Sequence, residues 1–140
     1  MFNGMTRLIF AALAFLVIPL SADAADRRLS ISEFEELVNG RTLYFDRGGQ
    51  RFGTEQYFDD KRVIWSFENG TCQFGIWFDN ADGQICFIYE NQPGSICWDF
   101  VQQSDGSYAA RSEGSPLSDQ LVVRGRDQEP IQCPLPDLGI

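Results

Sequence analysis

From Thr42 onward, turn-forming residue pairs interrupt an alternation of apolar and polar residues, and this pattern restricts the chain to a fold built from β-hairpins. The pairs Asn69-Gly70, Asp82-Gly83 and Asp105-Gly106 tolerate the positive φ angles that tight hairpin turns require. Successive hairpins without an intervening helix are typical of an antiparallel meander. We therefore predict a mainly β fold, an antiparallel meander of about 7–8 strands that forms a small barrel or a strongly curved sheet. The predicted strands are Thr42–Asp46, Thr54–Phe58, Arg62–Phe67, Cys72–Phe78, Gln84–Tyr89, Ile96–Gln102, Tyr108–Arg111 and Gln120–Arg124.

Residues 30–39 carry the pattern of one short N-terminal helix. Ser30, followed three positions later by Glu33, forms a capping box, and Gly40 suits a left-handed helix stop. The apolar side chains recur at helical spacing on one side of this segment, at Ile31, Phe34, Leu37 and Val38. We expect this amphipathic helix to plug or flank the sheet.

The ends of the chain differ in composition from the rest. Residues 1–24 have the layout of a secretory signal peptide, with Arg7 before an apolar run and Ala22-Asp23-Ala24 as the cleavage pattern; an uncleaved anchor is the alternative. We expect residues 25–126 to form the β-rich domain with its N-terminal helix. Residues 127–140 form a Pro-rich C-terminal tail, in which the prolines disfavour regular structure. The mature protein is expected to have no membrane span and to be a monomer in the periplasm or secreted.

The alternation also predicts which side chains face the core. If Asn69-Gly70 is a two-residue turn, Trp65 lies opposite Phe74, and both face inward. The same parity places Phe87 and Trp98 on the inner face of the following strands. We therefore predict an inner wall centred on Trp65, Phe74, Phe87 and Trp98, which either packs solidly or encloses one small ligand. The opposite face then carries an apolar strip of Trp77, Ile64, Ile88 and Val101, to be covered by the helix or left exposed for a partner.

Four cysteines lie after the signal peptide, and an even number in a small exported domain indicates two disulfides. Cys86 and Cys97 fall on the outward face of adjacent strands, where a cross-strand bridge is geometrically feasible. Cys72, on the core side by the same parity, is left to pair with Cys133, which would attach the tail to the sheet. Four cysteines allow three connectivities, so the other two pairings stay open.

The chain contains no histidine, which excludes Ser-His and Cys-His nucleophilic pairs and histidine zinc sites. Its net charge of −9 argues against nucleic-acid binding and favours cationic partners. Asp99, between two aromatic residues, points away from the core and is interpreted as a solvated strand residue. Asp79–Gly83 lacks the ligand pattern of a calcium loop, and Arg47–Arg51 is interpreted as a flexible connection. We predict no catalytic residue, cofactor or metal.

Three strand segments carry a family resemblance. Gly75-Ile76-Trp77, Gln84–Tyr89 and Cys97-Trp98 resemble the G-x-W, L-C-F and C-W strands of small exported alphaproteobacterial proteins of unassigned function. In those proteins a Leu-Ser-rich short helix precedes a β-barrel-like domain, and here Leu29–Ser32 stands at the start of the helix. The resemblance covers roughly residues 29–112 and implies the fold and the hairpin disulfide but no activity.

Taken together, these patterns favour a non-catalytic periplasmic binding module for a partner protein or a small apolar ligand. The alternatives are a carboxylate-based hydrolase and a structural or stress-related envelope protein. A cavity with aromatic walls would favour a ligand, an exposed Trp77 strip a protein partner, and converging carboxylates an enzyme.

Overall fold

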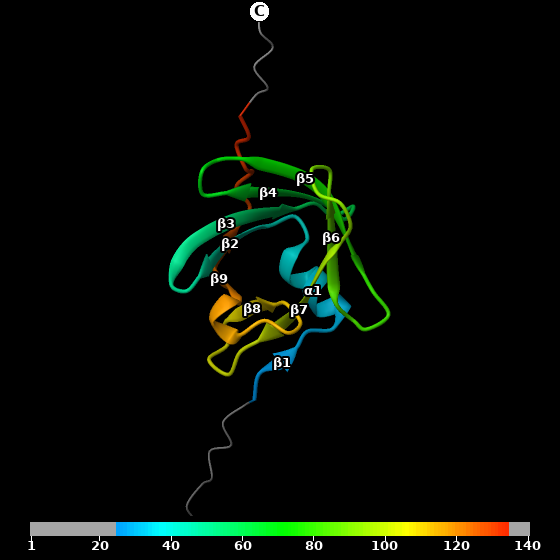
Figure 1. Ribbon diagram of the computed structural model, residues 1–140, viewed down its shortest axis with the longest axis vertical. Coiled ribbons are helices and arrows are strands. Elements are labelled where there is room, and N and C mark those ends of the chain that lie inside the picture. The colour runs from blue at the N-terminus through cyan, green and yellow to red at the C-terminus, as the bar shows by residue number, and fades with distance from the viewer. Residues whose placement is uncertain (1–24, 135–140) are drawn as a thin grey trace, which may run out of the picture.

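The structure, a computed structural model, describes residues 25–134, and within them eight antiparallel strands form a closed barrel. The predicted signal peptide therefore lies outside the described residues. Figure 1 shows the strands as a ring around the line of sight, with the single helix inside its outline. The elements are β1 Arg27–Arg28, α1 Ile31–Val38, β2 Thr42–Arg47, β3 Gln50–Tyr57, β4 Arg62–Phe67, β5 Cys72–Asp79, β6 Ile85–Tyr89, β7 Ile96–Gln102, β8 Tyr108–Arg111, a 3-10 turn Leu117–Asp119 and β9 Leu121–Asp127.

The barrel closes because its first and last hairpins pair with each other. Strands β2 to β7 follow one another as a meander, β9 pairs with β2, and β8 pairs with both β9 and β7. β1 adds a short extra strand beside β7, with Arg27 opposite Gln102. This arrangement confirms the predicted mainly β fold with one short helix, and closure leaves the eight barrel strands without a continuous open edge.

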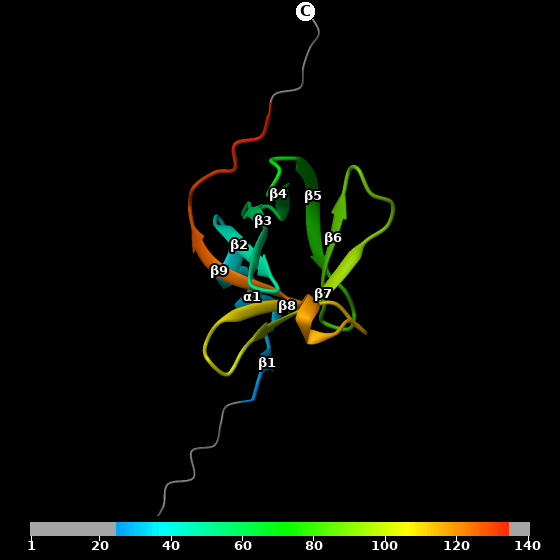
Figure 2. The same cartoon turned by 60° about the vertical axis from the view of Figure 1, so that its left-hand side comes forward.

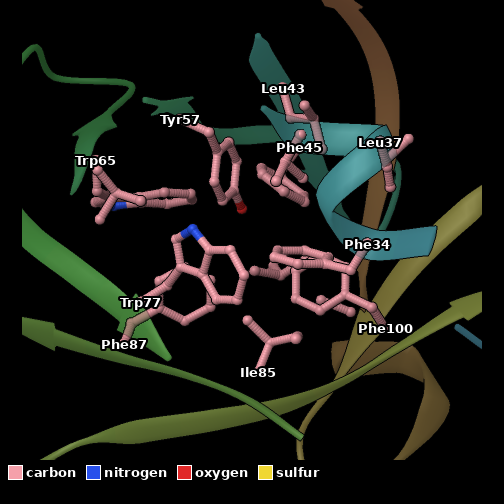
Figure 3. Close-up of a cluster of buried hydrophobic side chains, with 14 of the residues drawn as sticks. Phe34, Leu37, Leu43, Phe45, Tyr57, Trp65, Trp77, Ile85, Phe87 and Phe100 are labelled. Atoms are coloured by element: carbon pink, nitrogen blue, oxygen red, sulfur yellow. The ribbon is translucent and has the colours of Figure 1, made fainter. Parts of the chain in front are cut away.

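The helix begins and ends as the sequence predicts. The Ser30 hydroxyl accepts from the Glu33 backbone N–H at 3.2 Å, and the Glu33 carboxylate accepts from the Ser30 N–H at 2.7 Å. After the helix, Gly40 has a φ of +67°. Phe34 on the inner side of α1 is fully buried and packs on Trp77 and Phe100, with ring centroids 5.0 and 4.6 Å away. The helix therefore plugs one opening of the barrel, and Figure 3 shows these rings converging beneath it.

Two local predictions are wrong. The segment Arg47–Arg51 is a tight β2–β3 hairpin rather than a flexible connection, because Gly48 and Gly49 both adopt the positive φ of such turns. The predicted tail boundary is also too early by one residue, because β9 continues to Asp127 and pairs there with Thr42.

The β4–β5 hairpin differs from the prediction by one residue in register. Trp65 lies opposite Gln73, and Phe74 lies opposite Ile64. The turn is wider than two residues, because the Phe67 N–H bonds to the Thr71 carbonyl and the Gly70 N–H bonds back to the Phe67 carbonyl. Since side chains alternate with a period of two, this one-residue shift moves every β5 side chain to the opposite face. Cys72 and Phe74 therefore face outward, whereas Trp77 faces inward.

The two disulfides join the pairs expected from the sequence. Cys86 and Cys97 are opposite each other on β6 and β7, with Cα atoms 4.0 Å apart. Cys72 bonds to Cys133 across 61 positions, from the outer face of the barrel and not from the core side as predicted. Disulfides of this kind are typical of an oxidising compartment.

The segment after β9 lies along the outside of the barrel, as the orange-to-red chain in Figure 2 shows. The buried Thr42 hydroxyl donates to the Glu129 carbonyl at 2.6 Å, and the Ile131 N–H donates to the Gln56 side chain at 2.8 Å. Contacts with β2 and β3 thus guide this segment toward its disulfide on β5. Among residues 25–134 no helix is long and apolar enough to span a membrane.

Candidate functional site

A cavity of about 200 Å³ lies inside the barrel, at the end opposite to α1. Its walls come from the hairpin ends of β2–β3, β4–β5 and β6–β7, whereas the helix leads into the other end of the barrel, where the Tyr57 N–H bonds to the Arg41 carbonyl. For scale, a dry cavity of about 150 Å³ accommodates benzene. The lining residues are Phe45, Arg47, Phe52, Glu55, Tyr57, Trp65, Phe67, Gln73, Phe87, Tyr89, Gln92, Ile96, Trp98, Phe100, Ala110 and Leu121.

Glu55 is the acidic side chain of this wall, and it is 2% exposed. It lies on β3 between Leu43 of β2 and Trp65 of β4, so apolar neighbours flank it on both sides. The Tyr89 hydroxyl, from β6 across the barrel, donates to its carboxyl oxygens at 2.9 and 3.0 Å. Burial raises the pKa of Glu55 to about 8, and the hydrogen bond from Tyr89 acts in the opposite direction.

The two tyrosines of the cavity remain protonated at neutral pH. Burial raises the pKa of Tyr57 and of Tyr89, and the nearby Glu55 carboxylate raises both further. Tyr89 is therefore a hydrogen-bond donor toward Glu55. At neutral pH this part of the cavity holds a carboxyl group that is mostly protonated but close to ionisation.

Two glycines give the rings of the cavity their positions. A Cβ atom on Gly75 would contact the Ile88 carbonyl and approach Tyr89 Cδ1 to 2.8 Å, so only glycine allows the Tyr89 ring to lie against β5. A Cβ atom on Gly53 would approach Trp65 Cη2 to 2.6 Å. Close backbone approach at these positions thus fixes the Tyr89 hydroxyl near Glu55 and the Trp65 ring over β3.

The rim of the cavity is polar and carries one positive charge. The Arg47 guanidinium lies 4.0 Å from the centroid of the Phe52 ring, and its buried Nε has no hydrogen-bond partner among the described residues. Gln92 contacts Gln73 across the rim at 3.4 Å. The cavity therefore has a positive rim, aromatic walls and an acidic group in its interior.

The predicted inner wall is correct at three of its four residues. Trp65, Phe87 and Trp98 line the cavity, but Phe74 is 46% exposed on the outer face because of the register shift. Asp99 forms an ion pair with Arg28 at the barrel surface. Glu55 was not among the site residues predicted from the sequence. It lies two positions before Tyr57 on the same strand, and residues two positions apart on a strand share a face.

The predicted outer strip loses Trp77 for the same reason, whereas Val101 keeps its predicted face on β7, opposite Arg28 of β1. Trp77 is 1% exposed and belongs to the core, and Val101 is buried. In their place Phe74 and Ile76 stand beside Ile88 on the outer face of β5 and β6. A small apolar patch of these three residues is thus exposed on the barrel.

The arrangement suits recognition of a small molecule by aromatic contact and one carboxyl group. Acid–base hydrolysis by paired carboxylates needs two acidic groups. Among the residues that line the cavity, Glu55 is the single acidic one. Comparisons of the chain with protein-family models, with curated proteins and with solved structures found no match.

Proposed function

We propose that this protein is a non-catalytic binding module that holds a small, largely apolar ligand inside its barrel. One observation carries the proposal: the side chains leave about 200 Å³ at the hairpin end of the barrel interior, in a pocket that is partly open to solvent and lined by aromatic rings and one carboxyl group. Binding sites for small molecules are typically concave and mostly apolar, with few polar groups that orient the ligand.

The compartment of this module is proposed to be the periplasm or the extracellular space. The two disulfides support an oxidising environment. The signal-peptide pattern of residues 1–24 supports export.

Binding of a protein partner is the second candidate, supported by the exposed apolar patch of Phe74, Ile76 and Ile88. This patch is made of three side chains, and Trp77, the expected centre of the strip, is buried in the core. The aromatic pocket inside the barrel therefore favours the small ligand.

Native mass spectrometry of the mature protein, purified with its disulfides intact, tests the proposal. We expect a retained small molecule, or a saturable change in tryptophan fluorescence on titration with 2-phenylethanol, because Trp65 and Trp98 line the cavity. Ala110→Leu adds side-chain volume inside the cavity and should abolish binding, whereas Ile76→Ser on the exposed patch should leave it intact. A bare mass together with no response to 2-phenylethanol would overturn the proposal, and a retained protein lost in Ile76→Ser would establish the second candidate instead.

A further inference from the structure

The Glu55 carboxyl group lacks the partners that a buried acid normally has. Its one hydrogen-bond partner in the described structure is the Tyr89 hydroxyl, which has a single proton to donate and lies 2.9 and 3.0 Å from the two carboxyl oxygens. The six ion pairs within residues 25–134 all join other residues at the barrel surface. An ionised carboxylate at this position would be buried without a counter-charge, which is costly in a low-dielectric interior.

The walls around Glu55 are suited to a cation. Trp65 neighbours Glu55 on β4, and the Phe87 and Tyr89 rings stack nearly parallel, with an interplanar angle of 5° and centroids 6.1 Å apart. Aromatic faces carry negative electrostatic potential and attract ammonium groups, most strongly where the pair is desolvated. The net charge of −9 attracts cations to the protein as a whole.

We infer that the ligand is a small organic cation, an ammonium group on an apolar body, whose positive charge pairs with the Glu55 carboxylate between the aromatic rings. This inference rests on the proposed function, since it names the chemical class of the ligand in the same cavity. The ammonium supplies the missing counter-charge and hydrogen-bond donors to the carboxyl oxygens. The apolar body of the ligand fills the space toward the rim.

Arg47 determines the orientation of such a ligand. Its guanidinium lies on Phe52 at the rim, about three residues or 10 Å along β3 from Glu55. A positive rim repels an ammonium group, so the charged end of the ligand points inward and its neutral end outward. A bound carboxylate would be placed in the reverse direction, at Arg47.

Binding also moves one proton. When the ammonium pairs with Glu55, the carboxyl O–H bond breaks and the proton passes to the buffer, while the ligand keeps its own proton. The other titratable groups that face Glu55 are Tyr89 from β6 and Tyr57 from its own strand, and both keep their protons at neutral pH. The protein thus releases up to one proton for each cation bound, with Glu55 as its source.

The test compares three probes that share one ring and differ in their head group: 2-phenylethylamine, 2-phenylethanol and phenylacetate. Isothermal titration at pH 8, in two buffers of different ionisation enthalpy, gives the affinity and the number of protons released. We expect the amine to bind at least about tenfold more tightly than the alcohol, a difference of about 1.4 kcal/mol, since hydrogen bonds between charged groups are stronger than those between neutral groups. Phenylacetate should bind most weakly.

Two variants with the same chemical substitution, one inside the pocket and one at the surface, separate the local carboxylate from the overall field. Glu55→Gln should weaken amine binding about tenfold or more, abolish proton release and leave 2-phenylethanol binding within about threefold. Glu113→Gln, at an exposed turn residue, should change none of these quantities.

The outcomes distinguish this inference from the proposed function. If 2-phenylethanol binds and the amine binds no more tightly, or if Glu55→Gln behaves like Glu113→Gln, the cation is excluded and the cavity function stands. If phenylacetate binds most tightly, Arg47 is the recognition group and the inference is overturned. If none of the three probes binds, the inference fails, and the proposed function fails with it where the purified protein also shows a bare mass. The three-probe comparison on the unmodified protein needs no variant, so it decides the question even if Glu55→Gln does not fold.

Discussion

Replacing Glu55 with glutamine should make the unliganded protein less sensitive to alkaline pH. Glutamine has the size of the protonated carboxyl group and still offers an oxygen to the Tyr89 hydroxyl, but it cannot ionise. The substitution therefore leaves the packing of the site in place and removes one titration from the folded protein.

The expected magnitude follows from the pKa of the buried group. Glu55 has a pKa of about 8 in the folded protein, against a usual value of 4.5. Because the raised folded pKa means that the native state holds the proton more tightly, the stability contribution of Glu55 is fully present below pH 4.5. It falls by about 1.4 kcal/mol per pH unit as the pH rises from 4.5 to 8 and then levels off, a loss of about 5 kcal/mol in all.

The assay is urea unfolding of the disulfide-intact protein, followed by tryptophan fluorescence, at several values between pH 4.5 and 9. We expect Glu55→Gln and the unmodified protein to have similar free energies of unfolding near pH 4.5. The variant should become progressively more stable than the unmodified protein, by about 3 kcal/mol at pH 7. Glu113→Gln is the control, because it removes an exposed carboxylate and should leave the stability profile unchanged in shape.

One result would refute this reasoning. If the difference in unfolding free energy between Glu55→Gln and the unmodified protein stays constant from pH 5 to pH 9, Glu55 does not titrate within this window. The carboxyl group would then be ionised at neutral pH in the unliganded protein, either solvated or paired, and the description of the cavity as a site with an uncompensated acid would be wrong.

Three further sets of substitutions test how the barrel holds this site. Gly75→Ala should cost about 1–3 kcal/mol of unfolding free energy, because its Cβ would press on the Ile88 carbonyl and the Tyr89 ring. The control is Gly125→Ala, whose Cβ would meet no atom within 4 Å and which should change the unfolding free energy by about 0.5 kcal/mol or less. Equal effects of the two substitutions in urea unfolding would contradict the close approach at Gly75. Phe34→Ala should lower the free energy of unfolding by about 3–5 kcal/mol, because it removes the buried ring that packs on Trp77 and Phe100. A loss below about 1 kcal/mol would mean that α1 does not seal the barrel. Replacing Cys72 and Cys133 with serine should lower the free energy of unfolding by about 4 kcal/mol, and replacing Cys86 and Cys97 should lower it by about 3 kcal/mol, because the first disulfide closes a loop of 61 positions and the second a loop of 11. The opposite order in thermal unfolding would show that loop entropy does not dominate the effect.

Local chemistry in the sequence predicted the helix and several strands at their observed bounds, although β3 begins at Gln50 rather than Thr54 and β1 was not predicted. The capping box of Ser30 and Glu33 defines the start of α1, and the strands β4, β7 and β8 have the predicted bounds. These features depend on neighbours within a few positions, which a sequence displays directly. The pairing of Cys86 with Cys97 likewise follows from two adjacent strands and one short connection.

The register of the β4–β5 hairpin needed the tertiary structure. The residues around Asn69-Gly70 are compatible with turns of different length, and the wider turn is the one that places Trp77 against Phe34 inside the barrel. Because each step of one residue exchanges the two faces, that choice moved Phe74 out of the predicted wall and Trp77 into the core.

The sequence by itself determined the fold class, the helix and its cap, and the lack of histidine among the polar residues. The tertiary structure alone decided that the barrel closes around an unfilled space and that Glu55 lies inside it against Tyr89. Tyr89 is 34 positions away in the chain from Glu55. The physical reason is that burial and the pKa of a carboxyl group depend on side chains brought together from distant strands, and the spacing of residues along the chain does not encode that meeting.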